Sequence, residues 1–492
     1  MPHRIVQFAR GVILGAVVCL LFMVFAAHSS AAATAERVAE HTDPVAPILI
    51  ALVFIFFGAG LGGRGMRQIG QPAVLGELLV GMLVGNIAFY FREPVITVLR
   101  EGSTMVNVVA VALASNLSVP DAVSRVVIDP EHAQELADIL RGPAGPIAVS
   151  IHMFIDQLSR LGVIVLLFLV GLETTVREMG RVGRTAFLVA VVGVVVPFLL
   201  GIGAMAVLHP AAPLKADIFV GAILTATSVG ITARVFRDLR QAQRNEAKII
   251  LGAAVIDDVL GLVLLAVVSA LVVTGTISFA TLSWISFKAF AFLAGSIGLG
   301  VWVTPRLVRQ IARLDIENVK LLFGLGLAFV FSWLANRFGL ATIVGAFAAG
   351  LVLEELFLDE LKGHSLRDLL SPIESLFVPV FFVLMGMQVK LETFGDWKVV
   401  LIAAVLTAVA IAGKLVSGLA CEKKFDRLSV GIGMMPRGEV GLIFASIGKG
   451  LGVVSDAIFS AVVIMVMVTT LLTPPLLKIA LARGDRRAAA SA

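Results

Sequence analysis

The chain has 492 residues, of which 59% are hydrophobic and only 15% are charged, and its mean hydropathy is +1.00. Soluble domains carry about 25% charged residues, so this composition excludes the soluble classes and indicates a membrane protein. The formal net charge of +5 does not indicate a nucleic-acid partner, because the Lys and Arg residues lie in short loops between apolar stretches.

The chain begins with the pattern of a secretory signal peptide. Arg4 and Arg10 form a basic start, residues 11–27 are apolar, and the Ala-Thr-Ala sequence at 33–35 offers a small-residue cleavage site. Residues 1–35 are therefore predicted to be a signal peptide, with an uncleaved N-terminal anchor as the alternative.

Apolar stretches of transmembrane length recur along the rest of the chain. Each is long enough to cross a hydrocarbon core of roughly 30 Å as a helix, and the runs are continuous rather than alternating, which favours helices over a barrel. We predict an all-α polytopic membrane protein with about thirteen transmembrane helices. They lie at about 47–63, 73–91, 159–173, 186–207, 217–234, 249–273, 283–303, 319–335, 338–354, 374–389, 398–420, 428–447 and 457–478.

Basic loops set the predicted orientation. Lys and Arg residues gather after the odd-numbered spans, which should therefore end in the cytoplasm. The mature N-terminus would then lie outside a bacterial-type cell (inner) membrane, and residues 481–492 would form a short cytoplasmic tail. Residues 92–158 would form an extracytoplasmic insertion within the transmembrane domain at 47–480, and the sequence assigns this insertion no chemistry.

Two glycine motifs recur and indicate an internal repeat. The stretch IGQPAVLGELLVGMLVG at 69–85 shares its glycine spacing with FGLATIVGAFAAGLVL at 338–353, and LFLVGLETTV around Gly171 is similar to FVLMGMQVKL around Gly386. Each pair falls on spans predicted to run in opposite directions, as in the inverted-topology repeats of many secondary transporters. Close helix packing at glycine is the alternative explanation.

Two adjacent acidic residues, Asp257 and Asp258, lie inside the apolar span at 249–273. A carboxylate near a helix centre costs about 2.5–3.5 kcal/mol to insert, so the pair indicates a function. Consecutive helical side chains point about 100° apart, so the two carboxylates face different neighbours. A carboxylate binds either a monovalent cation or a proton, and competition between the two at one group is sufficient for exchange.

Two further spans contain helix-breaking and polar residues. GAILTATSVGITARVF at 221–236 carries Thr227 and Ser228 in its middle, and GIGMMPRGEVGLIF at 431–444 contains Pro436 with Arg437 and Glu439 beside it. Interrupted helices in corresponding positions of two halves indicate a transport site, although the hydroxyls could instead bond to their own helix.

Three other charged residues lie within or close to predicted spans. Lys414 either extends its amine to the cytoplasmic boundary or pairs with one of the two aspartates. Glu77 and Glu173 are interpreted as polar contacts between helices. All seven histidines lie outside the central parts of the spans, so the exchange would not use histidine.

These motifs together resemble the monovalent cation:proton antiporter-2 family, in its sodium/proton antiporter branch. The resemblance runs from about residue 47 to 480 and includes LLFLVGLETTV, TATSVGITARVF, VIDDVLGL, PIESLFVPVFFVLMGMQV and MMPRGEVGLI in order. It implies a dimerisation domain, a mobile core domain with two crossed broken helices, and a homodimer that works by elevator-like alternating access.

The resemblance also implies roles for individual residues. Asp258 would be the essential ligand of the transported cation and of the proton, and Asp257 would pair with Lys414. The breaks of the crossed helices would contribute the remaining site residues, which are Thr227, Ser228, Arg437 and Glu439. Relatives with two carboxyl groups at this place are generally electrogenic.

We therefore expect electrogenic exchange of Na⁺ or Li⁺ for H⁺, with K⁺/H⁺ exchange at the same residues as the alternative. A Na⁺-coupled organic-solute symporter and an ion channel are more remote alternatives. An enzyme is not expected and neither is a cofactor, because the sequence has no phosphate loop, no nucleophile-base set and no cofactor fingerprint.

Overall fold

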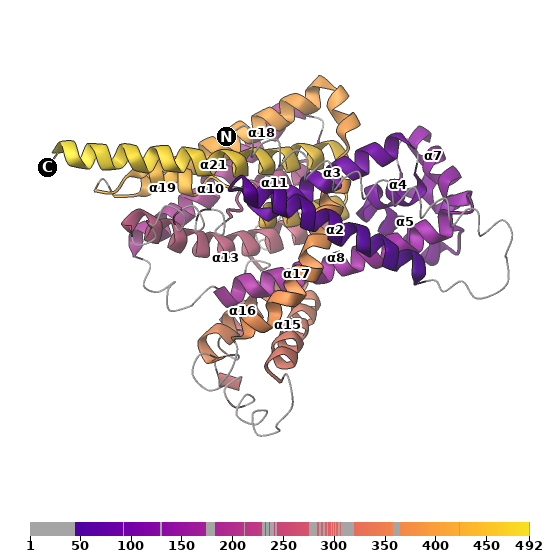
Figure 1. Ribbon diagram of the computed structural model, residues 1–492, viewed down its shortest axis with the longest axis horizontal. Helices are drawn as coiled ribbons and strands as arrows, with labels where there is room; N and C mark the ends of the chain where they lie inside the picture. Colours follow the sequence, from indigo (N-terminus) through magenta and orange to yellow (C-terminus); the bar gives the residue numbers. More distant parts are fainter. Residues whose placement is uncertain are drawn as a thin grey trace. The chain divides into compact units, whose positions relative to one another are not determined.

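The computed structural model describes residues 45–91, 93–127, 130–173, 183–210, 212–228, 244–274, 319–357, 365–422 and 424–491, with isolated residues between 232 and 241 and between 283 and 306. The predicted signal peptide at 1–35 lies outside these residues. All regular elements in the described part of the chain are helices, so the prediction of an all-α polytopic membrane protein is confirmed (Figure 1).

Eight helices in the described residues are long and apolar enough to cross a membrane, or nine if a pair bent by 90° at Gly102 counts as one span. This number is below thirteen because some predicted spans are interrupted or short. The span at 217–234 is interrupted after α11 (Leu214–Ile223), and that at 428–447 divides into α19 (Arg427–Gly433) and α20 (Glu439–Gly450). The span at 283–303 is only partly described.

The chain divides into two compact units. The first contains Met1–Val163 and Glu374–Gly395, and the second contains Ile164–Ile373 and Asp396–Ala492. Two helices, α8 (Gly145–Glu173) and α17 (Leu366–Met387), contribute residues to both units. The last helix, α21 (Asp456–Ser491), continues through most of the predicted tail at 481–492.

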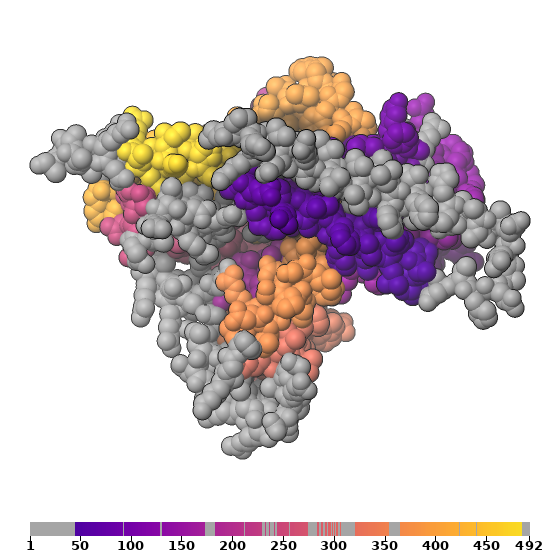
Figure 2. All heavy atoms as spheres, viewed as in Figure 1, coloured from indigo at the N-terminus to yellow at the C-terminus, as the bar shows by residue number. Residues whose placement is uncertain are grey.

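The first unit begins with an antiparallel pair of helices, α2 (Ala46–Gln68) and α3 (Ala73–Tyr90). Apolar side chains at helical spacing on α2, Leu49, Val53 and Phe57, are exposed, as expected of a surface that meets lipid. Figure 2 shows α2, in indigo, at the surface of the molecule.

Residues 92–158, for which we predicted an extracytoplasmic insertion, form four short helices and the start of α8. The four are α4 (Pro94–Glu101), α5 (Ser103–Ser115), α6 (Val119–Val126) and α7 (Pro130–Arg141). They enclose an apolar cluster of their own, which includes Val98, Val108 and Leu136. The bend at Gly102, whose φ is 55°, separates α4 from α5.

The repeated glycine motifs make the same kind of contact in each unit. At four of their glycines, the glycine lies so close to a backbone carbonyl oxygen of another helix that no side chain could fit. In the first unit, an ideal β-carbon on Gly81 would lie 2.1 Å from the Val383 oxygen, and one on Gly386 would lie 2.2 Å from the Leu78 oxygen. In the second unit, a β-carbon on Gly350 would lie 2.3 Å from the Phe168 oxygen, and one on Gly171 would lie 2.3 Å from the Phe347 oxygen. The repeated motifs are therefore two copies of one helix crossing, α3 with α17 and α16 (Thr342–Phe357) with α8.

A buried charged cluster joins α4 to the turn after α17 inside the first unit. Lys390 Nζ lies 3.0 Å from Glu101 Oε1, which is also 3.1 Å from His132 Nε2 on α7. Beside this pair, Arg100 contacts the Glu392 carboxylate at 2.7 Å. The insertion at 92–158, to which the sequence assigned no chemistry, is thus attached by ion pairs to the turn that follows α17.

This cluster predicts a measurable loss of stability. Glu101→Leu should lower the free energy of unfolding by roughly 3 kcal/mol, because it removes the buried carboxylate that contacts both Lys390 Nζ and His132 Nε2. Adding Lys390→Met should recover part of the loss. Thermal unfolding of the purified protein in detergent measures both effects.

The control is Asp138→Asn, which removes one partner of the exposed Asp138–Arg141 pair and should cost less than about 1 kcal/mol. A Glu101→Leu variant as stable as the Asp138→Asn variant would contradict the importance of the cluster.

Candidate functional site

The site is built where two interrupted helices of the second unit cross. The first is α11, after which Thr225–Ser228 continue without helical structure, and the second is broken between α19 and α20. Ser228 N donates to the Pro436 carbonyl at 2.9 Å, and Thr232 Oγ1 donates to the Gly433 carbonyl at 2.6 Å. Each break therefore supplies backbone groups that the other break uses.

Arg437 stabilises this crossing. Its side chain is completely buried, and its Nη1 donates to the carbonyls of Thr225, at 3.1 Å, and Ala226. Its Nη2 donates to the Ala410 carbonyl on α18 (Trp397–Ser417) at 3.3 Å. The carbonyls at a helix end lack intrahelical donors, so the guanidinium satisfies acceptors that the break in the first helix exposes.

Asp257 forms a buried ion pair with Lys414. Asp257 lies on α13 (Asn245–Thr274), Lys414 lies in the last turn of α18, and Lys414 Nζ is 3.0 Å from Asp257 Oδ1. Both side chains are 0% exposed, so Lys414 does not extend to the membrane boundary. The second carboxylate oxygen, Asp257 Oδ2, has no hydrogen-bond partner among the described residues.

Asp258, the next residue on α13, is also buried, and it is close enough to Lys414 to interact with it electrostatically. Arg437 interacts in the same way with Asp257. The described charged side chains at the crossing are thus two carboxylates and two cations, whose formal charges sum to zero. When a cation enters this site, another positive charge must leave it, because an uncompensated buried charge is very unfavourable.

Oxygen atoms suited to a monovalent cation lie at the same crossing. Thr227 and Ser228 are both buried at the break of the first helix, and Thr227 Oγ1 has no hydrogen-bond partner among the residues the structure describes. Hydroxyl, carbonyl and carboxylate oxygens are the ligands that hard cations prefer. In the described part of the chain, no group of three or more His, Cys, Asp or Glu residues could hold a resident metal ion.

Three other acidic residues from the sequence are not part of the described site. Glu439 is the first residue of α20, and Glu173 is the last residue of α8, but their side chains lie outside the described residues. Glu77 is buried on α3 in the first unit.

Sequence reasoning missed two hydroxyls of α21. Thr470 Oγ1 donates to the Arg437 carbonyl, and Arg437 N donates to Thr469 Oγ1 at 3.4 Å. Both threonines are almost fully buried. The signal in the sequence was a pair of adjacent hydroxyls within an apolar span, a pattern typical of contacts between transmembrane helices.

The chain is similar to a set of known transport proteins. Residues 53–483 match the family model described as sodium/hydrogen exchanger, transmembrane. The high-affinity Na⁺/H⁺ antiporter NhaS3 of Synechocystis sp. is 38% identical over 456 residues, which cover 91% of this chain and 93% of NhaS3. The Na⁺/H⁺-K⁺ antiporter GerN of Bacillus cereus is 33% identical over 72% of this chain and 91% of GerN.

A solved structure supports the fold. The sodium proton antiporter MjNhaP1 of Methanocaldococcus jannaschii matches with a TM-score of 0.56 over 88% of this chain and 96% of MjNhaP1. The sequence identity is only 17%, so this likeness concerns the fold alone.

The crossing predicts that Gly438 and Gly441, both in the second broken helix, tolerate alanine differently. A β-carbon at Gly438 would lie 2.7 Å from the Ser228 side chain, whereas one at Gly441 meets nothing closer than 3.8 Å. Gly438→Ala should therefore lower the free energy of unfolding by about 1–3 kcal/mol through overpacking. Gly441→Ala should leave it unchanged or raise it by up to about 1 kcal/mol.

Thermal unfolding of the two purified variants compares these costs directly. Equal stability of Gly438→Ala and Gly441→Ala would show that the two breaks are not packed as described.

Proposed function

Because this chain belongs to the sodium/hydrogen exchanger family, we propose that it is a secondary antiporter exchanging Na⁺ or Li⁺ for H⁺ at Asp258 and Asp257. It is a multi-pass membrane transporter and not an enzyme. The observation that carries the proposal is the adjacent pair of buried carboxylates at the crossing of two broken helices. The likeness to NhaS3 over nearly the whole length of both chains supports Na⁺ as the cation.

In the proposed exchange, Asp258 binds either the cation or a proton. Deprotonated Asp258 offers carboxylate oxygens, and Thr227, Ser228 and the carbonyls at the break complete an oxygen-lined site. Protonation of Asp258 removes the negative charge that holds the cation. Cation and proton therefore exclude each other, and alternating exposure of the site to the two sides of the membrane couples their movements.

The zero sum of the four described charges, those of Asp257, Asp258, Lys414 and Arg437, supports electrogenic exchange. A cation held between Asp258 and Asp257 displaces Lys414 from Asp257, and this leaves the Lys414 charge buried without its partner. Loss of the Lys414 proton, together with the proton of Asp258, restores the charge balance. Two protons would then leave for each cation that enters, so each cycle moves one net charge.

The proposal includes the assembly and orientation expected from the sequence. The basic loops support a cytoplasmic C-terminus and an N-terminus outside. The resemblance of the motifs supports a homodimer in which the part of the chain carrying the site moves.

A second candidate is K⁺/H⁺ exchange at the same residues. GerN, a relative at 33% identity, is named a Na⁺/H⁺-K⁺ antiporter. Oxygen ligands on flexible backbone can fit cations of more than one size, so K⁺ would use the same carboxylates.

Replacement of the proposed ligand should abolish exchange. The asparagine of Asp258→Asn carries no charge, so it binds neither a proton nor a cation as the carboxylate does. We expect the rate of cation-induced dequenching of a pH-sensitive dye in everted vesicles to fall at least tenfold. This loss corresponds to a transition-state free energy higher by about 1.4 kcal/mol or more. Na⁺, Li⁺ and K⁺ tested in turn on the wild type separate the two candidate ions.

The control is Asp396→Asn, an identical change at the exposed N-cap of α18, where asparagine caps as well as aspartate. This variant should retain wild-type exchange. Wild-type rates in Asp258→Asn would overturn the assignment of the ligand.

Electrogenic exchange predicts a current. Proteoliposomes given a Na⁺ gradient should develop a current whose reversal potential corresponds to two protons per Na⁺. In the double variant Asp257→Asn/Lys414→Met, Asp258 and Arg437 remain of the four described charges, so exchange should become one for one and lose its net current. Exchange by the wild type without any current would contradict the proposed stoichiometry.

A further inference from the structure

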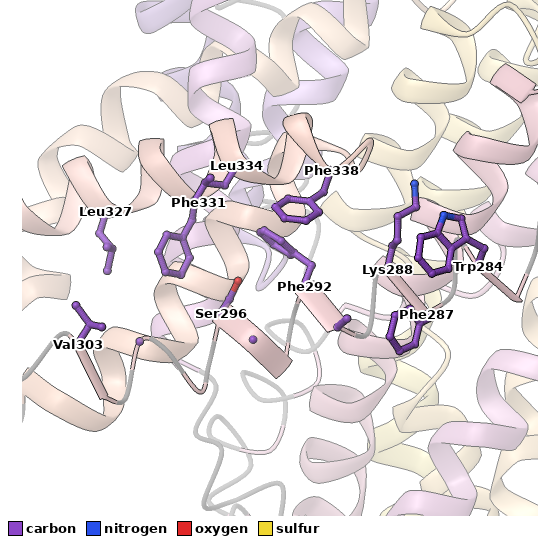
Figure 3. A pocket seen from close by; sticks show the side chains of 13 residues that line it. Trp284, Phe287, Lys288, Phe292, Ser296, Val303, Leu327, Phe331, Leu334 and Phe338 are labelled. Atoms are coloured by element: carbon purple, nitrogen blue, oxygen red, sulfur yellow. The ribbon is translucent and has the colours of Figure 1, made fainter.

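An apolar groove of about 600 Å³ lies in the second unit, apart from the carboxylate site. Figure 3 shows its two walls, the segment 283–303 on one side and α15 (Val319–Arg337) with the residues directly after it on the other. The described residues of segment 283–303 are helical, and those that line the groove recur every three or four positions, as one face of a helix does. The volume is within the range of about 300–1,000 Å³ typical of ligand sites.

The groove is apolar along its length and charged at one end. Phe292 and Phe338 both line it and contact each other as an aromatic pair, with ring centroids 5.7 Å apart. Lys288 is the one charged side chain among the lining residues, and Figure 3 shows it beside Trp284 at the end opposite Val303. Among the described residues, no carboxylate pairs with Lys288.

Exposed tryptophans place this charged end at the depth of lipid headgroups. Trp284 and Trp302 are 60% and 62% exposed and lie near the two ends of segment 283–303. The 18 positions between them in the sequence correspond to roughly 27 Å of helix at about 1.5 Å per residue, close to the roughly 30 Å of a hydrocarbon core. Tryptophans gather at the two membrane interfaces, so Lys288, one turn from Trp284, can extend its amine to the headgroups.

We propose that this groove binds an anionic phospholipid, with one acyl chain between segment 283–303 and α15 and the lipid phosphate at Lys288. Water does not fill an apolar groove, because each water molecule needs about two to four polar partners. From Leu327 to Phe338 the α15 wall extends roughly 16 Å, enough for most of an acyl chain. The Lys288 ammonium binds phosphate as a point charge and favours an anionic over a zwitterionic headgroup.

Two glycines of segment 283–303 provide a matched test. Neither Gly295 nor Gly298 has another atom within 4 Å of an added β-carbon, so both accept a larger side chain, but only Gly295 lines the groove. Gly295→Leu should fill the groove and weaken lipid binding at least tenfold. Gly298→Leu, which adds the same volume, should bind lipid as the wild type does.

The probe is phosphatidylglycerol, compared with phosphatidylcholine that has the same acyl chains. Native mass spectrometry of the full-length protein counts bound lipid, and the shift in unfolding temperature on adding each lipid gives a second readout. The wild type should prefer phosphatidylglycerol by about three- to tenfold. Lys288→Gln should lose the preference but keep binding phosphatidylcholine, and Lys288→Arg should retain it.

Three results would overturn the proposal. Equal binding of phosphatidylglycerol by wild type and Gly295→Leu would show that lipid lies elsewhere. Equal binding of both lipids by the wild type would remove the role of Lys288. Disulfide-linked dimers of a Gly295→Cys variant in membranes would show that a second copy of the chain covers the groove. None of these results depends on which cation is transported.

Discussion

The buried ion pair between Asp257 and Lys414 is the interaction on which the arrangement of the site depends. It joins α13 to α18 with both side chains removed from solvent, and a buried charge is tolerated only when it is paired and hydrogen-bonded. Asp258 and Arg437 extend the pair to four charges, which cancel among the side chains that the structure describes here. The site can therefore exist within an apolar helix bundle, but its balance changes whenever a cation or proton enters.

Arg437 links this charge balance to the backbone. Its guanidinium bonds to carbonyls at the break after α11, and its own backbone carbonyl accepts from Thr470 on α21. The breaks are thus maintained by polar contacts across helices rather than by either helix alone. A change at the carboxylates can reach the break after α11 and α18 through this side chain, and α21 through the backbone of the same residue.

The periodic and compositional signals in the sequence predicted much of the fold. Continuous apolar runs predicted the helices, and the shared glycine spacing predicted a repeat whose glycines, such as Gly81 and Gly350, make equivalent close contacts. The motifs also predicted breaks in two of the spans, and the structure interrupts these two after α11 and between α19 and α20, around Pro436. The charges at Arg100 and Glu101 received no role, since their partners, Glu392 and Lys390, lie almost 300 residues away.

By itself the sequence determined that the protein spans a membrane and that Asp257 and Asp258 are exceptional, because the cost of a carboxylate in an apolar helix depends only on its immediate surroundings. The resemblance of the motifs gave the pairing of Asp257 with Lys414, which the residues alone left open. Only the tertiary structure decided that Lys414 is buried, that Arg437 bonds to the facing break, and that Thr469 and Thr470 support it. Such contacts join residues distant in the chain, and local patterns carry no information about which distant partner a polar group finds.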